Sequence, residues 1–324
     1  MADQDQTGPG ALAERTRLDP LPRWPSVAPD DLVLKNVHGD SMMRRLRRAA
    51  AGPFRAAEDV QALEVSGHWI QHPVTTGRRI AVTGIRGGAG KSTVSTLIAA
   101  AFARFRRDRV LALDLDPEFG SLPLRLGVRP GRSATDLTRV AVGTASFEEV
   151  ETRLERLGER LWALPGSRDF MGSGRLDAAA YRSAGLPLSR FFGVTIADCG
   201  AGIRTDLHRA VLADAHAQLL VTPATPEGAA SAGAALDWLG RSNLRGLVPR
   251  TIVVFTVHSW TGSRAFDLAG ARRILRDAGA EALLLGYDGH LAIGTTIDPE
   301  HLGYSARISA IELAAAALRA ALRP

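Results

Sequence analysis

The chain has 324 residues, 45% of them hydrophobic, which is enough to bury the core of one large α/β domain or two smaller ones. It has no apolar run of membrane-spanning length, no signal-peptide pattern and a single cysteine, Cys199, so neither a membrane span nor an internal disulfide nor a multi-cysteine metal site is expected. The formal net charge of +6 is typical either of a protein with an anionic partner or of a solvated, arginine-rich surface. The cytoplasm is the expected compartment, with peripheral attachment to a membrane as an alternative.

Two N-terminal segments differ from the rest of the chain. Residues 1–30 are polar and interrupted by prolines, which predicts a disordered tail. Residues 31–76 form an extension with a basic amphipathic helix predicted near 41–51. The apolar side of that helix would carry Met42, Met43, Leu46, Ala49 and Ala50, and the other side Arg44, Arg45, Arg47 and Arg48. The helix could contact an anionic membrane, nucleic acid or a partner protein, or it could pack on its own domain with the arginines in solvent.

From residue 77 to residue 324, apolar strand patterns alternate with helix patterns. Buried strands are predicted at 79–84, 109–116, 160–166, 192–200, 217–224, 250–258 and 282–288, and helices at 91–105, 146–158, 204–215, 226–240, 263–279 and 306–322. This order predicts one doubly wound α/β domain with a mostly parallel sheet and helices on both faces. In such sheets ligands bind beyond the carboxyl ends of the strands.

The loop after the first predicted strand reads RGGAGKST and has the composition of a phosphate-binding loop. The residues expected to surround the phosphates of a nucleotide are Gly87, Gly88, Ala89, Gly90, Lys91, Ser92 and Thr93. Lys91 would contact the β- and γ-phosphates of ATP, Ser92 would place its hydroxyl on Mg²⁺, and Thr93 would lie near the α-phosphate. Lys91 is unusual in this chain because only it and Lys35 are lysines among the 40 basic residues. The strict pattern G-x-x-x-x-G-K-[ST] fails at its first position, Ile85.

The same segment resembles the deviant P-loop of the MinD/ParA family of ATPases, which usually begins with a signature lysine followed by G-G-x-G-K-[ST]. Arg86 stands at the position of that lysine. In the family the lysine crosses a dimer interface and contacts the nucleotide of the other subunit. The substitution keeps the charge and changes its geometry, so Arg86 is expected to replace the lysine functionally, with loss of the contact in trans as the alternative.

Two further segments are similar to motifs of that family. LALDLDPEFGSL resembles the D-x-D segment of the first switch, in which Asp116 would orient the attacking water and Asp114 would support the hydrated metal. GVTIADCGAGI resembles the D-S-P-A-G-I segment, in which Asp198 would hold Mg²⁺ through water and residues 200–202 would form a mobile second switch. Each aspartate taken alone is as typical of a helix cap or turn, but three such elements occur here in the family's order.

The C-terminal part extends the resemblance. VTPATPEGAASA is similar to the family's T-x-P-E segment, and LLLGYDGHLAIGTTID followed by ARISAIELAAA resembles its closing strand, loop and last helix, a region that helps to frame adenine. Tyr287 and Asp288 are therefore expected at the nucleotide. His258 follows the strand after which the family often has an asparagine, and it is a weaker candidate for a base contact. The arginine-rich style, the N-terminal extension and DCGAG are most similar to actinobacterial MinD-like ATPases associated with type VII (ESX) secretion.

The resemblance implies an ATP- and Mg²⁺-dependent homodimerisation switch that hydrolyses ATP slowly under the control of a protein partner. Lys91, Asp116 and Arg86 would carry its chemistry, and it would position or regulate a cellular assembly such as a type VII secretion system. Two alternatives are a nucleotide-binding scaffold that hydrolyses ATP weakly, and a ParA-like DNA-segregation ATPase that binds DNA through Arg241, Arg245, Arg250, Arg272, Arg273 and Arg276. An iron–sulfur reductase of this fold would need two cysteines per subunit, and a tyrosine kinase of this group a C-terminal tyrosine cluster; the sequence has neither.

Overall fold

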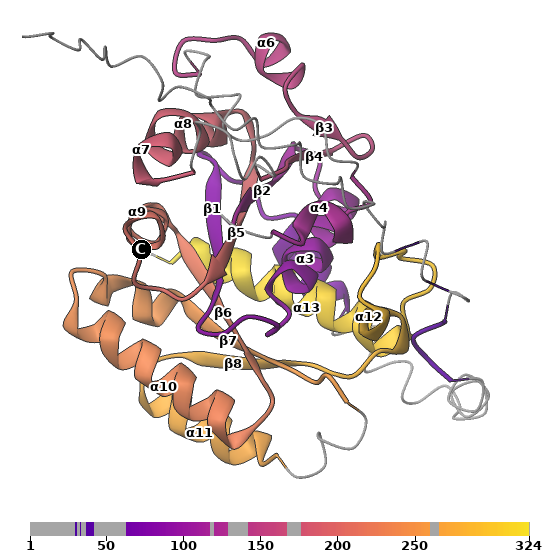
Figure 1. Cartoon of the computed structure of the whole chain (residues 1–324), viewed down its shortest axis with the longest axis vertical. Coiled ribbons are helices and arrows are strands. Elements are labelled where there is room, and N and C mark those ends of the chain that lie inside the picture. The colour runs from indigo at the N-terminus through magenta and orange to yellow at the C-terminus, as the bar shows by residue number, and fades with distance from the viewer. Residues whose placement is uncertain are drawn as a thin grey trace, which may run out of the picture. The chain divides into compact units, whose positions relative to one another are not determined.

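The computed structural model describes residues 30, 33, 37–41, 63–116, 120–128, 142–166, 176–259 and 266–323. Its centre is an eight-stranded sheet in the order β3-β4-β2-β5-β1-β6-β7-β8 (Figure 1). The strands are β1 (Arg78–Gly84), β2 (Val110–Leu115), β3 (Glu155–Arg156), β4 (Leu161–Leu164), β5 (Val194–Ala201), β6 (Ala217–Pro223), β7 (Thr251–Thr256) and β8 (Glu281–Leu285). β3 is antiparallel to β4, and the other neighbours are parallel. The predicted α/β class with a mostly parallel sheet is confirmed.

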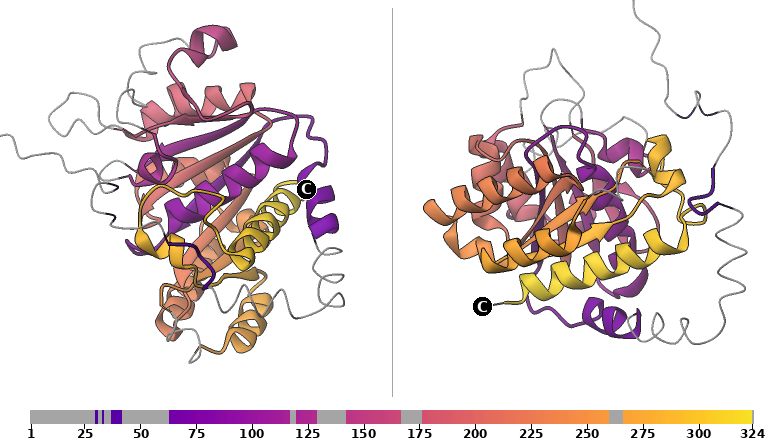
Figure 2. Two further views of the ribbon diagram at one scale, coloured as in Figure 1. Left: turned by 90° about the vertical axis from the view of Figure 1, so that its right-hand side faces the viewer. Right: turned by 90° about the horizontal axis from the view of Figure 1, so that it is seen from below.

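Helices cover both faces of the sheet. The helical elements after β1 are α3 (Lys91–Phe105), α4 (Leu122–Arg125), α6 (Phe147–Glu151), α7 (Ala178–Ala180), η2 (Tyr181–Gly185), α8 (Leu186–Leu188), η3 (Ser189–Phe191), α9 (Asp206–Asp214), α10 (Pro226–Arg241), η4 (Arg245–Arg250), α11 (Leu268–Asp277), α12 (Gly289–Ile293) and α13 (Tyr304–Ala321). Figures 1 and 2 show α3 and α13 together on one face and α10 and α11 on the other. Two buried apolar clusters, one on each face, hold these layers together.

The central strand β1 shows why the sheet is apolar on both faces. Ile80 and Val82 belong to the cluster on the α3 and α13 side, whereas Ala81 belongs to the opposite cluster. Successive side chains of a strand point to opposite faces, so a strand covered by helices on both faces reads as one continuous apolar run. β1 lies between β5 and β6: strands β2 to β5 lie on one side of it, and the chain crosses after β5 to β6, β7 and β8 on the other side. The loop after β1 therefore emerges where a doubly wound sheet binds ligands.

One helix is shorter than the sequence pattern predicts. A single helix over 146–158 is expected, but α6 ends at Glu151 and residues 155–156 form β3 instead. Glu155 and Arg156 pair with Ala163 and Trp162 of β4, so the sheet edge supplies the backbone hydrogen bonds. Gly158, at a φ of 135°, provides the reversal between the two strands. Tertiary pairing therefore overrides the local helix pattern.

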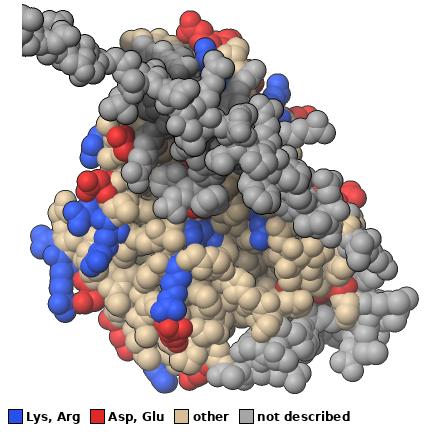
Figure 3. Space-filling view, in the orientation of Figure 1, with Lys and Arg blue, Asp and Glu red and all other residues tan. Residues whose placement is uncertain are grey.

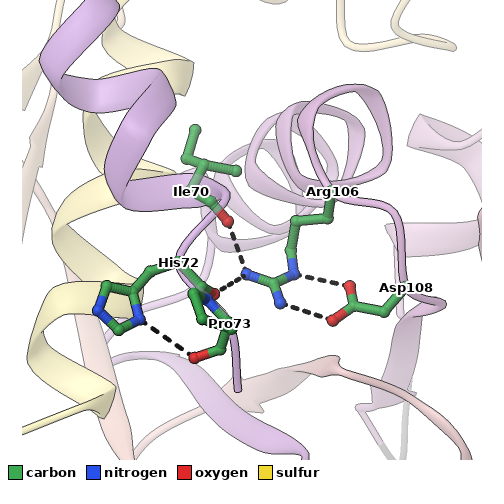
Figure 4. Close-up of polar contacts among 5 residues, drawn as sticks. All are labelled: Ile70, His72, Pro73, Arg106 and Asp108. Carbon is green, nitrogen blue, oxygen red and sulfur yellow. Dashed lines mark hydrogen bonds and ion pairs between the residues drawn. The ribbon is translucent and has the colours of Figure 1, made fainter.

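Residues 63–74 pack against the body of the sheet domain, although they precede the predicted domain start at residue 77. Residues 63–70 are helical, and Ile70 is completely buried. Figure 4 shows the contact that holds this segment: the buried Arg106 guanidinium donates to the carbonyl oxygens of Ile70 (2.6 Å) and His72 (3.0 Å) and to the carboxylate of Asp108 (2.7 Å from Nε). One arginine, directly after α3, therefore joins the extension to the turn that precedes β2.

An earlier stretch, residues 37–41, lies against the loops around α12 and α13. Asp40 accepts a hydrogen bond from the Tyr304 backbone N–H (2.9 Å), and the Gly39 N–H donates to the His301 carbonyl (2.7 Å). The first amides of a helix lack intrahelical acceptors, so the Asp40 carboxylate acts as a cap for α13.

The chain divides into two compact units, Met1–Leu34 and Lys35–Pro324. The predicted tail at 1–30 lies outside the described residues except for Asp30, and the predicted helix at 41–51 except for Ser41. Within the described part of the chain, none of the helices combines the length and apolarity needed to cross a membrane.

Candidate nucleotide-binding site

The loop between β1 and α3 has the backbone conformation of a phosphate cradle. Gly88 and Gly90 have φ values of 73° and 90°, in the left-handed region that favours glycine. A Cβ at Gly84 would lie 2.8 Å from the Val221 carbonyl oxygen and 3.1 Å from the Lys91 Cδ. Glycine at position 84 therefore lets the lysine side chain pass close to the strand.

The start of α3 is suited to binding an anion. Lys91 is the first helical residue, the preceding Gly90 provides no side-chain cap, and the first turn contains no acidic residue. The positive end of the helix dipole and the unpaired amides of the first turn favour a phosphate at such a position. The Thr256 hydroxyl lies 2.8 Å from the Ala89 carbonyl oxygen, which ties the loop to the end of β7. Lys91 itself is 9% exposed, so its ammonium lies within the protein.

Two buried carboxylates lie beneath the loop. Asp114 and Asp198 are register partners on the adjacent strands β2 and β5, and each is 1% exposed. Burial, followed by the negative charge of the neighbouring Asp198, raises the pKa of Asp114 from 3.8 to about 7. Burial also raises the pKa of Asp198 to about 6, against the lowering effect of hydrogen bonds from Ser92 and Ser95. The Ser95 hydroxyl donates to Asp198 Oδ1 at 2.8 Å.

The donor set of this cluster fits Mg²⁺. It consists of hydroxyl and carboxylate oxygens, the ligands that hard divalent cations prefer. A nearby cation would favour the ionised forms of Asp114 and Asp198, which burial disfavours. Asp116 lies half-buried beside them, and its N–H donates to Asp114 Oδ1 at 3.1 Å.

A cavity of about 470 Å³ opens above these groups. Its lining consists of Gly87, Gly88, Gly90, Lys91, Ser92, Thr93, Asp116, Ser121, Arg125, Ala201, Thr256, Val257, His258, Leu285, Gly286, Asp288, Leu291 and Ala292. The loop and Asp116 make one end polar, and apolar side chains such as Leu285 and Leu291 from the β8 and α12 region contribute the other. A polar end for phosphates and an apolar end for a base match the two halves of a nucleotide.

Most of the predicted site residues line this cavity, and the rest lie around it. Ala89 is a buried member of the loop, and Asp114 and Asp198 lie beneath the loop. Tyr287 is half-buried and outside the lining. Arg86 is also outside it: the side chain is 58% exposed and forms an ion pair of 2.7 Å with Glu227, itself 69% exposed.

Asp288 and His258 reach the cavity in different ways. Asp288 lines it, but both carboxylate oxygens accept backbone N–H groups: Oδ1 from His290 and Leu291, and Oδ2 from Gly303. The carboxylate thus fixes the shape of the wall. The Nε2 of His258 lies 3.0 Å from the Thr256 hydroxyl, and burial lowers the pKa of this histidine. His258 lines the cavity as a neutral, polar group.

The segment after Asp198 closes the polar end of the cavity. Gly202 has a φ of 92°, and its N–H donates to the Gly84 carbonyl at 2.9 Å. A Cβ at Gly200 would lie 3.2 Å from the Asp116 carboxyl carbon. This segment is thus in contact with both the P-loop strand and Asp116.

A search against protein families finds the CobQ/CobB/MinD/ParA nucleotide-binding domain over residues 80–297. The chain belongs to this MinD/ParA family. The resemblance expected from RGGAGKST, the D-x-D segment and GVTIADCGAGI is therefore confirmed. Nucleotide binding at a P-loop is the property that the family shares, and the described cavity lies within the matched residues.

Individual members show the same relationship. The ESX-1 secretion-associated protein EspI of Mycobacterium tuberculosis is 30% identical over 74% of this chain, which spans only 36% of the length of EspI. Among solved MinD/ParA structures, a ParA family ATPase from Chlorobium tepidum has a TM-score of 0.62 at 18% identity, covering 73% of this chain and 98% of its own. The MinD of Pyrococcus horikoshii, crystallised with Mg-ADP, has a TM-score of 0.53 at 20% identity, covering 74% and 94%. At these identities the two structures support the fold.

Several cavity residues of this MinD/ParA protein are not predicted by its motifs. Arg125, on α4, directs Nη1 to the carbonyl oxygens of Leu291 (3.4 Å) and Thr295 (3.3 Å), and burial lowers its pKa. In a chain that has so many arginines, nothing in the sequence singles out this one. Thr256 is part of a predicted strand, and only the fold shows that its hydroxyl meets the P-loop.

Proposed function

We propose that this protein is a Mg²⁺-dependent ATPase of low turnover that acts as an ATP-controlled dimerisation switch. The observation that carries the proposal is the convergence on one cavity of Lys91, Ser92 and Asp116, directly above the buried Asp114 and Asp198 pair. A site that bound nucleotide only as a structural element would have no need of desolvated carboxylates beside the phosphate end, because these cost stability.

The position of each residue in the cavity indicates its proposed role. The α3 amides and Lys91 would hold the phosphates, and Ser92 together with Asp198 would hold Mg²⁺, with Asp114 behind them. Mg²⁺ would neutralise negative charge on the phosphate oxygens. Asp116, the only one of the three carboxylates that lines the cavity, would orient the attacking water. Thr256 and the α12 region would support the base end.

Arg86 is the basis for the dimer in this proposal. Its side chain is exposed at the rim of the loop, and its ion pair with Glu227 is between two exposed groups. Exposed ion pairs stabilise a fold by only about 0–1 kcal/mol, so the arginine can leave this partner at little cost. It would then reach the phosphates bound by a second copy, as the signature lysine of the family does.

The test is the oligomeric state, measured by light scattering with ADP and with ATP plus Mg²⁺. Wild type, Asp116→Ala and the double variant Arg86→Ala/Asp116→Ala are compared. Slow or blocked hydrolysis in Asp116→Ala should trap an ATP-dependent dimer, and the added loss of Arg86 should return it to a monomer. Arg153→Ala in the Asp116→Ala background is the matched control, since Arg153 is exposed and follows α6.

A monomer under every condition, together with normal ATP binding, would refute the dimer mechanism and leave a nucleotide-binding scaffold. A dimer that survives the loss of Arg86 would refute the role of this residue alone. The 30% identity to EspI supports a type VII secretion system as the assembly that the switch serves, acting from the cytoplasm or at the membrane surface. Co-purification of secretion components with Asp116→Ala and ATP, absent with ADP, is the expected result.

A second candidate is nonspecific DNA binding. Basic side chains gather on the flank that carries the end of α10 and η4 (Figure 3). Arg245 is exposed on η4, and Arg273 and Arg276 are exposed on α11. Two other arginines are already engaged: Arg241 is paired with Asp237, and Arg250 donates to backbone carbonyls. Gel retardation with ATP, at increasing salt, would support this function if the affinity falls steeply, because counterion release dominates such binding.

A further inference from the structure

His208 is a buried side chain that the proposed mechanism leaves unused. It lies in the first turn of α9 and is 3% exposed. Its Nε2 lies 3.1 Å from the Gly200 carbonyl oxygen, and its Nδ1 lies 2.6 Å from the Thr205 hydroxyl. A carbonyl oxygen can only accept, so Nε2 carries the proton and Nδ1 accepts from Thr205. Burial lowers the pKa of His208, which agrees with this neutral form.

The Thr205 hydroxyl completes the arrangement. It accepts a hydrogen bond from the His208 backbone N–H (3.2 Å) and is thereby the cap of α9. With its proton directed to Nδ1, the hydroxyl is both donor and acceptor within one turn. The imidazole is therefore held in one tautomer and one orientation by the helix on which it lies.

The Gly200–Ala201 peptide, whose carbonyl contacts His208, is part of the wall of the cavity. The carbonyl of Gly200 and the N–H of Ala201 are parts of one peptide unit, and the described residues contain no cis peptide bond. In a trans peptide these two groups point in opposite directions. A carbonyl directed at His208 turns the Ala201 N–H away from α9, and Ala201 lines the cavity together with Lys91 and Asp116.

We propose that His208 is a positioning residue: it fixes the Gly200–Ala201 peptide so that the Ala201 N–H faces the γ-phosphate of bound ATP. Rotation of the peptide would replace that donor by a carbonyl oxygen, which repels a phosphate. The following residue is fixed independently, because the Gly202 N–H donates to the Gly84 carbonyl. Residues 200–202 are thus held between β1 and α9. A change at this segment on binding of the γ-phosphate would therefore be transmitted to α9. This inference rests on the proposed ATPase switch and adds the element through which it acts.

The test compares His208→Leu with His208→Gln. The Gln amide is long enough to donate to the Gly200 carbonyl, whereas Leu fills the space and donates nothing. Four quantities are measured for each variant: the steady-state turnover of Mg-ATP, the Kd of a fluorescent ADP, the Tm, and the hydrogen exchange of a peptide covering residues 199–204. His216→Asn is the control, because His216 lies at the amino end of β6 and its Nδ1 accepts from the Arg79 N–H.

Loss of the hydrogen bond should lower the turnover of His208→Leu about three- to tenfold, with the ADP affinity changed less than about twofold. Exchange at 199–204 should rise, and the protection that ATPγS adds over ADP should disappear. His208→Gln should restore turnover and protection to within about threefold of wild type. At pH 8, where His216 is neutral in both the folded and the unfolded chain, the control should match wild type in all these measurements.

Wild-type turnover and protection in His208→Leu would overturn the inference. So would equal losses of turnover, ADP affinity and Tm that Gln does not restore, because these indicate a role in folding alone. Failure of the proposed function looks different: the wild type itself would show no turnover and no difference between ATPγS and ADP. In that case exchange at 199–204 without nucleotide still decides whether His208 holds this peptide, since Leu should raise it and Gln should restore it.

Discussion

Replacing Asp198 by asparagine should make the nucleotide-free protein more stable. Asp198 is buried, and its pKa is raised from 3.8 to about 6. At a pH between these two values, the Asp198 carboxyl is ionised in the unfolded chain but still protonated in the folded protein. The free energy of unfolding therefore falls as the pH rises through this window, and it remains low above it. The amide of Asp198→Asn would carry no charge at any pH. The hydroxyls of Ser92 and Ser95 can turn to accept from the new amide, so the variant leaves no polar group without a partner.

The size of the effect follows from the pKa. The difference between 3.8 and about 6 corresponds to at most ~3 kcal/mol of unfolding free energy at pH 8. For a domain of this size that is a rise in Tm of roughly 5 °C. Thermal unfolding in EDTA at pH 5 and pH 8 measures it: Asp198→Asn should melt above wild type at both pH values, by about half as much at pH 5, which lies within the window, as at pH 8. Asp237→Asn, which removes an exposed carboxylate paired with Arg241, should change the Tm little at either pH.

Addition of Mg-ATP should narrow the difference between the two proteins. Ligand binding stabilises the folded state by mass action, by ~2.7 kcal/mol at a hundred times the Kd. Wild type should gain this stabilisation, and the variant should lose its Mg²⁺-dependent part. If Asp198→Asn melts at or below wild type in EDTA at pH 8, the carboxylate is not strained by burial, and the argument that it is arranged for a cation is wrong.

Three further changes test other parts of the structure. Arg106→Ala should cost about 3–5 kcal/mol, a fall in Tm of roughly 5–8 °C, because it leaves two carbonyls and a carboxylate without their donor, and Arg106→Lys should lose less. Equal Tm values for both would contradict this. Gly200→Ala should push the Asp116 carboxylate aside and lower kcat about ten- to hundredfold while ADP binding persists; an unchanged kcat would show that the carboxylate can move freely. Burial and nearby arginines lower the pKa of His216 from 6.5 to about 4. Between these pH values the imidazole is protonated in the unfolded chain but neutral in the folded protein, so the free energy of unfolding should fall as the pH drops from 6.5 to 4. His216→Asn should flatten that part of a urea-unfolding profile, and an unaltered slope would exclude this histidine as the cause.

The parts of the site that could be predicted are those encoded by local patterns. Glycines around Lys91 indicate a phosphate loop because a close backbone wrap needs them, and an aspartate at the end of an apolar run indicates a carboxylate at a strand end. That Asp114 and Asp198 lie side by side follows from the register of β2 and β5.

The residues that could not be predicted act on backbone groups of other elements. Thr256 contacts a loop 167 positions away, and His208 is an ordinary polar residue within a helix pattern until β5 brings the Gly200 carbonyl to it. Neither has a motif, because each acts through a backbone group whose position depends on tertiary structure. The strand β3 is not predicted for the same reason, since its partner is the edge of the sheet.

The hydrogen bond from Tyr304 to Asp40 has a practical consequence for anyone who shortens this protein. It joins positions 264 residues apart, and Asp40 lies beside Gly303, whose N–H donates to the Asp288 carboxylate of the cavity wall. A fragment cut to the family match at 80–297 would lose Asp40, the Arg106-bound segment at 63–74 and the whole of α13, whose alanines are buried against the sheet. Expression boundaries that keep residues 37–323 together retain the hydrogen bond between Tyr304 and Asp40, which a fragment limited to the family match would lose.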